Sequence, residues 1–249
     1  MSDYYRAQYG AAPAQRADMA VDAGLRSFMI GVYNKVAAGL VLSAALAYLT
    51  SSVQPIRDLM FVVGADGRLA SMTPLGWIVA FAPLGILLVS GFALRNPSSG
   101  AASGLYWTIV ALIGASLGVV GLMYTGASIA SMFLITAAAF GALSLFGYTT
   151  KKDLSGFGSF LIVGVVGLII ASLVNIFLRS EAVQFAVSVI GVFVFAGLIA
   201  YDTQRLKLTY YELGADTRGV ATSYGALSLY INFINLFQFL LSLFGQRRD

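Results

Sequence analysis

Two short stretches near the end of the chain place polar side chains inside otherwise apolar sequence. AYDTQRLK, residues 200–207, ends an apolar run on Asp202, and LYINFINLF, residues 229–237, carries Asn232. An ionised aspartate within a lipid-spanning helix costs about 2.5 to 3.5 kcal/mol, and less near a helix end, so it usually has a partner or a function. We expect Asp202 and Asn232 to meet at similar depth and form one site, unless Asp202 only caps or snorkels at an exposed helix end.

Arg95 is a candidate third member of this site. It lies in ALRNPSSG at the end of another apolar run, at the end of the bundle where Asp202 is expected. Taken alone, that stretch is typical of a helix stop followed by a loop. Only the combination with Asp202 makes Arg95 a candidate.

Polar residues also form a stripe along the last apolar run. At about 100° per residue, five of them fall within roughly a 120° arc of a helix. They are Ser228, Asn232, Asn235, Gln238 and Ser242. Facing lipid, each would lose hydrogen bonds to water at a cost of about 1 kcal/mol or more. The stripe therefore faces either a water-filled passage, with these residues lining a pore, or neighbouring helices that it hydrogen-bonds.

The composition indicates a membrane protein. Of the 249 residues, 59% are hydrophobic and 10% are charged, against roughly 25% charged in a soluble domain. Cysteine and histidine are absent, which excludes disulfides, the usual zinc ligands and Ser-His-Asp catalysis. We therefore expect no enzymatic activity and no bound cofactor.

Seven apolar runs are each long enough, at about 1.5 Å per residue, to cross a hydrocarbon core of about 30 Å. They cover approximately residues 28–50, 74–94, 104–124, 127–147, 158–178, 183–201 and 226–244. The expected fold class is an all-α membrane protein, a seven-transmembrane-helix bundle.

The basic residues predict the orientation. With the amino terminus inside, the 15 Lys and Arg residues divide ten to five in favour of the cytoplasmic side, as the positive-inside rule requires. Seven crossings then leave Arg247 and Arg248 outside, where they fit the rule poorly. The alternative is a last segment that re-enters the membrane or crosses it only partly.

Two regions follow from this pattern. Residues 1–26 lack apolar periodicity and are expected to form a mobile cytoplasmic tail, and residues 27–249 a seven-helix transmembrane domain. The basic residues form no patch interleaved with aromatic residues, so the expected partner is the lipid bilayer and not nucleic acid. The oligomeric state stays open, and a monomer is compatible with the sequence.

Small residues predict where helices pack closely. Gly114 and Gly118 form a GxxxG pair extended by Gly121, and Gly164 and Gly167 share one side of a later helix. We expect these glycines to pack against other helices and to have no further role.

Four stretches of the sequence carry a family resemblance. VYNKVAAGLVLSAALAY lies in the first span, FGYTTKKDLSGFGSFLIVGVVGLIIASLVNIF across the fourth loop and fifth span, GVFVFAGLIAYDTQRLK in the sixth, and ALSLYINFINLF in the seventh. Together they resemble the Bax inhibitor-1 family, also called the transmembrane Bax-inhibitor-motif family, in its bacterial YccA-like branch. The resemblance covers most of residues 28–245.

The resemblance implies a fold and an activity. Members of this family have seven helices with the last surrounded by the other six. They are described as pH-sensitive calcium leak channels in which two aspartates share a proton and an arginine latches against them. By motif, Asp202 occupies the first aspartate position and Arg95 the arginine position. The second aspartate position holds Asn232.

That departure changes the expected chemistry. Two adjacent carboxylates share a proton and titrate as a pair, which an aspartate and an asparagine do not do. Calcium prefers six to eight oxygen ligands, so Asp202 with Asn232 offers a weak Ca²⁺ site at best. The resulting hypothesis is a pH-modulated passive cation leak, with Ca²⁺ as the permeant ion and with gating blunted by Asn232.

Other functions remain open. The bacterial branch is also known to bind and regulate the membrane-embedded protease FtsH, in which case the protein would be a non-conducting regulator that engages the protease through its amino-terminal tail. A proton-coupled transporter fits less well, because it needs a titratable residue at mid-membrane depth. The resemblance and the cysteine-free, alanine-rich composition together suggest a bacterial inner membrane, although a mitochondrial relative would look similar.

Overall fold

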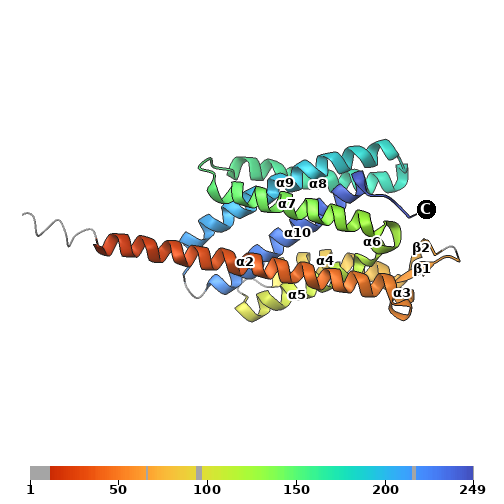
Figure 1. Cartoon of the computed structure of the whole chain (residues 1–249), viewed down its shortest axis with the longest axis horizontal. Coiled ribbons are helices and arrows are strands. Elements are labelled where there is room, and N and C mark those ends of the chain that lie inside the picture. Colours follow the sequence, from red (N-terminus) through yellow and green to blue (C-terminus); the bar gives the residue numbers. More distant parts are fainter. Residues whose placement is uncertain (1–11, 66, 94–96, 215–216, 249) are drawn as a thin grey trace, which may run out of the picture.

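The computed structural model describes residues 12–65, 67–93, 97–214 and 217–248, which form an elongated bundle of long helices (Figure 1). The elements, in chain order, are α2 (Ala12–Ser52), α3 (Gln54–Met60), β1 (Phe61–Val63), β2 (Leu69–Met72), α4 (Pro74–Ala93), α5 (Ser99–Ser116), α6 (Gly118–Met123), α7 (Gly126–Thr149), α8 (Ser155–Leu178), α9 (Glu181–Glu212) and α10 (Arg218–Phe244). Strands β1 and β2 pair antiparallel in a small hairpin that the sequence did not predict.

Seven helical stretches within the described residues are long and apolar enough to cross a bilayer, which confirms the predicted all-α membrane fold. The third of them combines α5 and α6, which meet at Leu117. The outer helices expose large apolar side chains, among them Phe160 and Phe177 on α8 and Phe193 on α9. Such a surface suits lipid rather than water.

Polar caps start several of these helices. Ser98, Thr125 and Ser180 precede α5, α7 and α9, and the side-chain oxygen of each accepts a hydrogen bond from the backbone N–H three residues later. Each cap satisfies one backbone donor that a helix start leaves unpaired.

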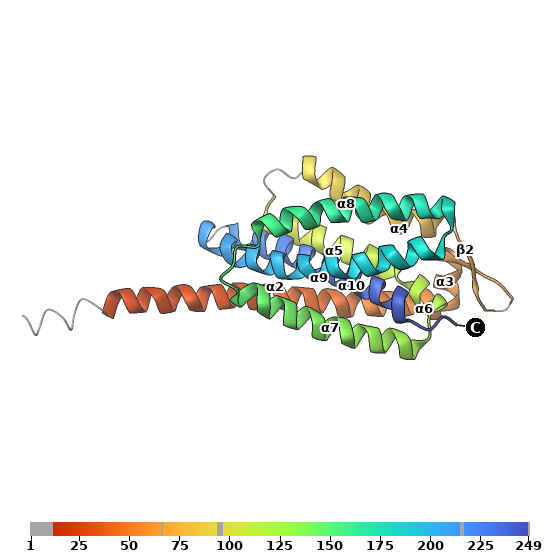
Figure 2. The same ribbon diagram turned by 90° about the horizontal axis from the view of Figure 1, so that it is seen from above.

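Helix α10 supplies much of the core. Its extensive contacts are with α2, α5, α7 and α9, and Figure 2 shows α9 and α10 running between α8 on one side and α2 and α7 on the other. Leu229, Tyr230 and Phe233 on α10 are almost completely buried. A position of this helix in the middle of all six others stays a prediction.

The last helix is long and apolar enough to cross a bilayer. Its 27 residues form one continuous helix, about 40 Å long at 1.5 Å per residue. The carboxyl terminus lies at the end of the bundle opposite the start of α2, beside the β1–β2 hairpin (Figure 1). This continuity favours a complete crossing, and whether the last segment crosses fully, partly or re-enters stays a prediction.

Part of the segment predicted to be a tail is helical. Helix α2 begins at Ala12, and its amino-terminal part projects beyond the other helices (Figure 1). Leu25, also within the predicted tail, is buried in the core. Residues 1–11 lie outside the described residues, and the mobility of the tail stays a prediction.

The glycine predictions have two outcomes. A Cβ added at Gly114 would lie 2.6 Å from the Ser43 Cα, and one at Gly121 would lie 2.8 Å from the Ser51 Cβ, so both glycines allow close approach to α2. A Cβ added at Gly167 would meet nothing within 4 Å. The packing prediction is confirmed for Gly114 and Gly121 and is wrong for Gly167.

Candidate functional site

Helix α9 holds Asp202 well inside the bundle. The sequence placed this residue at the end of the sixth apolar segment, but α9 continues from Asp202 to Glu212, a further ten residues or about 15 Å. The residue is only 4% exposed. Asp202 is therefore a buried carboxylate and neither caps a helix nor snorkels at an exposed end.

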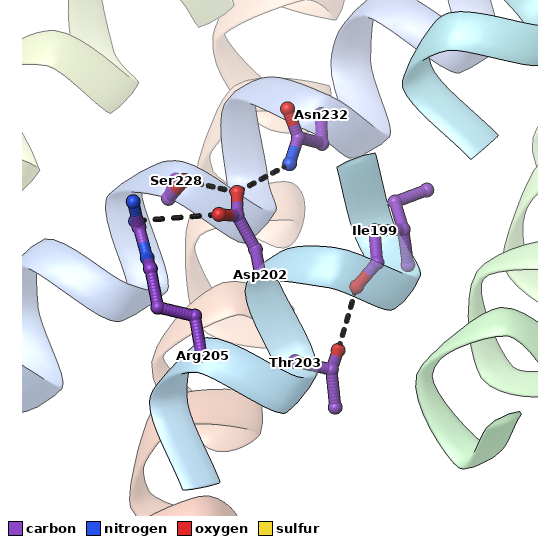
Figure 3. Close-up of polar contacts among 6 residues, drawn as sticks. All are labelled: Ile199, Asp202, Thr203, Arg205, Ser228 and Asn232. Carbon is purple, nitrogen blue, oxygen red and sulfur yellow. Dashed lines mark hydrogen bonds and ion pairs between the residues drawn. The ribbon is translucent and has the colours of Figure 1, made fainter. Parts of the chain in front are cut away.

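Helix α10 supplies two hydrogen-bond donors to this carboxylate. The Asn232 Nδ2 donates to the Asp202 Oδ2 at 2.8 Å, and the Ser228 hydroxyl donates to the same oxygen (Figure 3). Ser228 and Asn232 are four residues apart, one helical turn, so their side chains lie on the same face. The predicted meeting of Asp202 and Asn232 is present in the structure.

The cation at the site comes from the same helix as the carboxylate. The Arg205 guanidinium lies 3.2 Å from the Asp202 Oδ1, three residues along α9 (Figure 3). The Arg205 side chain is 50% exposed, whereas that of Asp202 is 6% exposed. Arg95, the cation expected from the sequence, lies outside the described residues. Sequence reasoning missed Arg205, although its spacing of three from Asp202 is the signal that identifies helical ion pairs.

Both carboxylate oxygens are thus engaged. Oδ2 accepts from α10 and Oδ1 faces Arg205, and hydrogen bonds to an ionised group are roughly twice as strong as neutral ones. The neighbouring Thr203 takes no part, because its hydroxyl donates to the Ile199 carbonyl of its own helix at 2.8 Å (Figure 3). Among the described residues, the site therefore pairs one acidic side chain with one basic side chain.

A cavity of about 620 Å³ adjoins the ion pair. Asp202, Arg205 and three members of the polar stripe line it on one side, and apolar residues of α4 and α8 line the other. The three stripe members are Ser228, Asn232 and Asn235. The Asn235 Nδ2 donates to the Ile231 carbonyl of its own helix at 2.8 Å.

The remaining stripe residues do not line this cavity. Gln238 is exposed, and Ser242 accepts hydrogen bonds from Ser188 at 3.1 Å and from Gln184 at 3.4 Å, both on α9. The stripe thus divides into three cavity-lining residues, one exposed residue and Ser242, which accepts two interhelical hydrogen bonds. Each of the two sequence interpretations describes part of the stripe, and neither describes Gln238. A pore-lining role for these residues stays a prediction.

The site is poorly suited to hold a divalent cation. No group of three or more His, Cys, Asp or Glu side chains in the described part of the chain could hold a metal ion. Asp202 supplies one carboxylate, and Asn232 directs its amide nitrogen toward it. Since Ca²⁺ takes six to eight oxygen ligands, these residues would form a weak Ca²⁺ site at best.

The fold and the site define an α-helical membrane protein with seven candidate spans and an ion pair at a buried carboxylate. The chain belongs to the Bax inhibitor-1 family, since the family model described as inhibitor of apoptosis-promoting Bax1 matches residues 25–249. A protein of Caulobacter vibrioides is 66% identical over 100% of both chains. A protein of Rickettsia prowazekii is 47% identical over 92% of this chain and 93% of its own. The inner membrane protein YbhL of Escherichia coli is 42% identical over 91% of this chain and 94% of its own.

Proposed function

We propose that the protein is a passive cation leak of a bacterial inner membrane, with its amino terminus in the cytoplasm, Ca²⁺ as the permeant ion and Asp202 as the selecting carboxylate. The observation that carries the proposal is a buried aspartate in the wall of a cavity of about 620 Å³, inside a candidate membrane span. An ionisable residue within a span is costly and commonly marks an ion pathway.

In the proposed leak, the described conformation is the closed state. Arg205 lies where a permeant cation would meet Asp202, and Ser228 and Asn232 engage the other carboxylate oxygen. The Arg205 side chain is half exposed and also lies 5.6 Å from the centre of the Tyr201 ring. Displacement of this one long side chain would free the carboxylate for a cation without moving a helix.

Asn232 makes the response to pH shallow. Two carboxylates at this distance would share one proton and titrate together, whereas an amide keeps its hydrogens throughout. The Asn232 amide holds a fixed hydrogen bond to Asp202 at 2.8 Å. Protonation therefore cannot alternate between the two positions, and the pH modulation of the leak is blunted.

Calcium flux into indicator-loaded proteoliposomes between about pH 6 and pH 8 tests this function. We expect Asp202→Asn to reduce the flux, Arg205→Gln to increase it and Asn232→Asp to make it steeply pH-dependent. Lys151→Gln is the matched control for charge, because Lys151 is exposed and has no ion pair within the described residues. Equal pH dependence of wild type and Asn232→Asp would contradict the role of Asn232, and flux no greater than that of empty liposomes would contradict the leak.

A non-conducting regulator of FtsH is the second candidate, favoured by the projecting start of α2. The 41 residues of α2 extend about 60 Å, twice the thickness of a hydrocarbon core. The apolar run of this helix begins near residue 28, and the helical residues before it form an extension that a partner could contact. Deleting residues 2–22 should abolish co-purification with FtsH and leave calcium flux unchanged. Unchanged co-purification would rule out this extension as the contact.

A further inference from the structure

The carboxyl-terminal segment, which carries two arginines that fit the predicted orientation poorly, is held in a defined place. The Thr125 N–H donates to the Gln246 carbonyl at 3.0 Å and the Arg248 N–H donates to the Met123 carbonyl at 2.9 Å. The Gln246 N–H also donates to the Ser128 hydroxyl at 2.8 Å. These bonds tie the segment to the connection between α6 and α7. Arg248 is thereby fixed at one end of the bundle.

Arg248 lies at the end of an apolar groove. Helices α2 and α7 both pack against α10 but pack little against each other, and α10 is visible between them in Figure 1. The gap contains a cavity of about 380 Å³ whose lining includes Arg248 but not Arg247. The apolar part of the lining includes Leu40 of α2, Ile129 and Phe133 of α7, and Phe237 of α10.

Polar groups gather at the Arg248 end of this groove. Ser51 and Ser52, at the end of α2, line the cavity together with Arg248. Arg248 is exposed and forms no ion pair within the described residues. A ligand that complements the groove therefore has an anionic, hydrogen-bond-accepting end and a long apolar end.

We propose that this groove binds one membrane phospholipid, with an acyl chain between α2 and α7 and its phosphate at Arg248. Arginine recognises phosphate through paired N–H donors, and the serine hydroxyls can donate to the same group. The groove lies between two candidate membrane spans, and in a bilayer phospholipid is the abundant ligand of this shape and charge. The lipid would cover the part of α10 that α2 and α7 leave uncovered.

Charge favours a phospholipid over a protein helix as the occupant. A phospholipid carries a fixed negative charge at one end of an apolar chain, which matches Arg248 at one end of the apolar lining. Small residues, among them Ala44, Ala47 and Gly126, border the space and leave room there for an acyl chain.

Native mass spectrometry of the detergent-solubilised full chain, titrated with phosphatidylglycerol, tests the proposal. We expect Arg248→Gln to weaken binding of the first lipid about tenfold, because a charged hydrogen-bond donor is lost. Arg247→Gln removes the same charge from a neighbouring exposed residue outside the groove and should leave binding unchanged. An equal loss of lipid affinity in the two variants would show that general surface charge causes the effect, and it would overturn the proposal.

A second pair of variants tests the acyl-chain position. Gly126 lines the groove, and a Cβ added there would meet nothing within 4 Å, so Gly126→Leu fills the groove without a clash at Cβ. Gly104→Leu is the control, since Gly104 is equally open but lies on α5 away from the groove. We expect about tenfold weaker binding in Gly126→Leu only. Unchanged binding in Gly126→Leu, or equally tight binding of glycerol 3-phosphate without acyl chains, would overturn the proposal. Neither measurement depends on ion flux.

Discussion

The coupling between Asp202 and Arg205 can be measured by a double-mutant cycle. Arg205→Gln leaves the buried carboxylate with its hydrogen bonds from Ser228 and Asn232 but without a counter-charge. Asp202→Asn removes the negative charge and leaves Arg205, which is 50% exposed, free to turn toward solvent. Arg205→Gln should therefore be the more destabilising single change, and the double variant should be more stable than the sum of the two single effects implies.

The structure sets the expected size of the coupling. Two unit charges 3.2 Å apart attract by about 5 kcal/mol at an effective dielectric constant of about 20. The exposure of Arg205 reduces this value, because exposed pairs contribute about 0.2 to 1 kcal/mol, whereas breaking a buried pair costs about 3 to 5 kcal/mol. For a pair with one buried and one half-exposed member we expect a coupling of about 1 to 2 kcal/mol.

The assay is unfolding from bicelles by a denaturing detergent, followed by circular dichroism of the helices. The pair Arg57–Asp58, with nitrogen and oxygen 2.9 Å apart and side chains 25% and 50% exposed, is the matched control and should couple by less than about 0.5 kcal/mol. A coupling within about 0.5 kcal/mol of zero for Asp202 and Arg205 would refute the reasoning, since independent sites add to within that margin.

Two further changes test the packing around the site. Gly147→Ala should destabilise the fold by about 1 to 3 kcal/mol, because an added Cβ would overlap the Ala200 carbonyl of α9. Gly141→Ala on the same helix is the control, since its Cβ would meet open space and should not destabilise the fold. Equal midpoints of detergent unfolding for the two variants would contradict this prediction. Gln204→Leu should raise hydrogen exchange of the Leu154 N–H and cost about 1 to 3 kcal/mol, because the buried Gln204 side chain accepts from that N–H at 2.9 Å. Unchanged exchange would show that the loop before α8 is held by other contacts.

The seven spans could be predicted because hydropathy and length act locally along the chain. The ends of the helices could not be predicted in the same way, because hydropathy marks the edge of the apolar segment and not the end of the helix. The sixth segment was predicted to end at residue 201, and α9 continues to Glu212. The seventh was predicted to begin near residue 226, and α10 begins at Arg218. Polar residues continue both helices past their apolar segments.

The site was predicted in part for a similar reason. The pairing of Asp202 with Asn232 could be predicted from an aspartate at the end of an apolar run and from the polar stripe. Arg205 was not predicted, because the family pattern points to an arginine on a distant helix, whereas the ion pair in the structure uses the spacing of three residues within α9. The depth of Asp202 depends on how α9 packs against α10, α7 and α8, which a single sequence does not contain.

The position of Arg205 also bears on how the chain is made. Ser228 and Asn232 follow Asp202 by 26 and 30 residues, which is about 1.5 to 6 seconds of synthesis at roughly 5 to 20 residues per second. During that interval neither α10 donor exists. Arg205 follows Asp202 by only three residues on the same helix, so it is the first of the three described partners to be synthesised. An arginine at this position gives the aspartate a counter-charge that does not depend on the packing of α10.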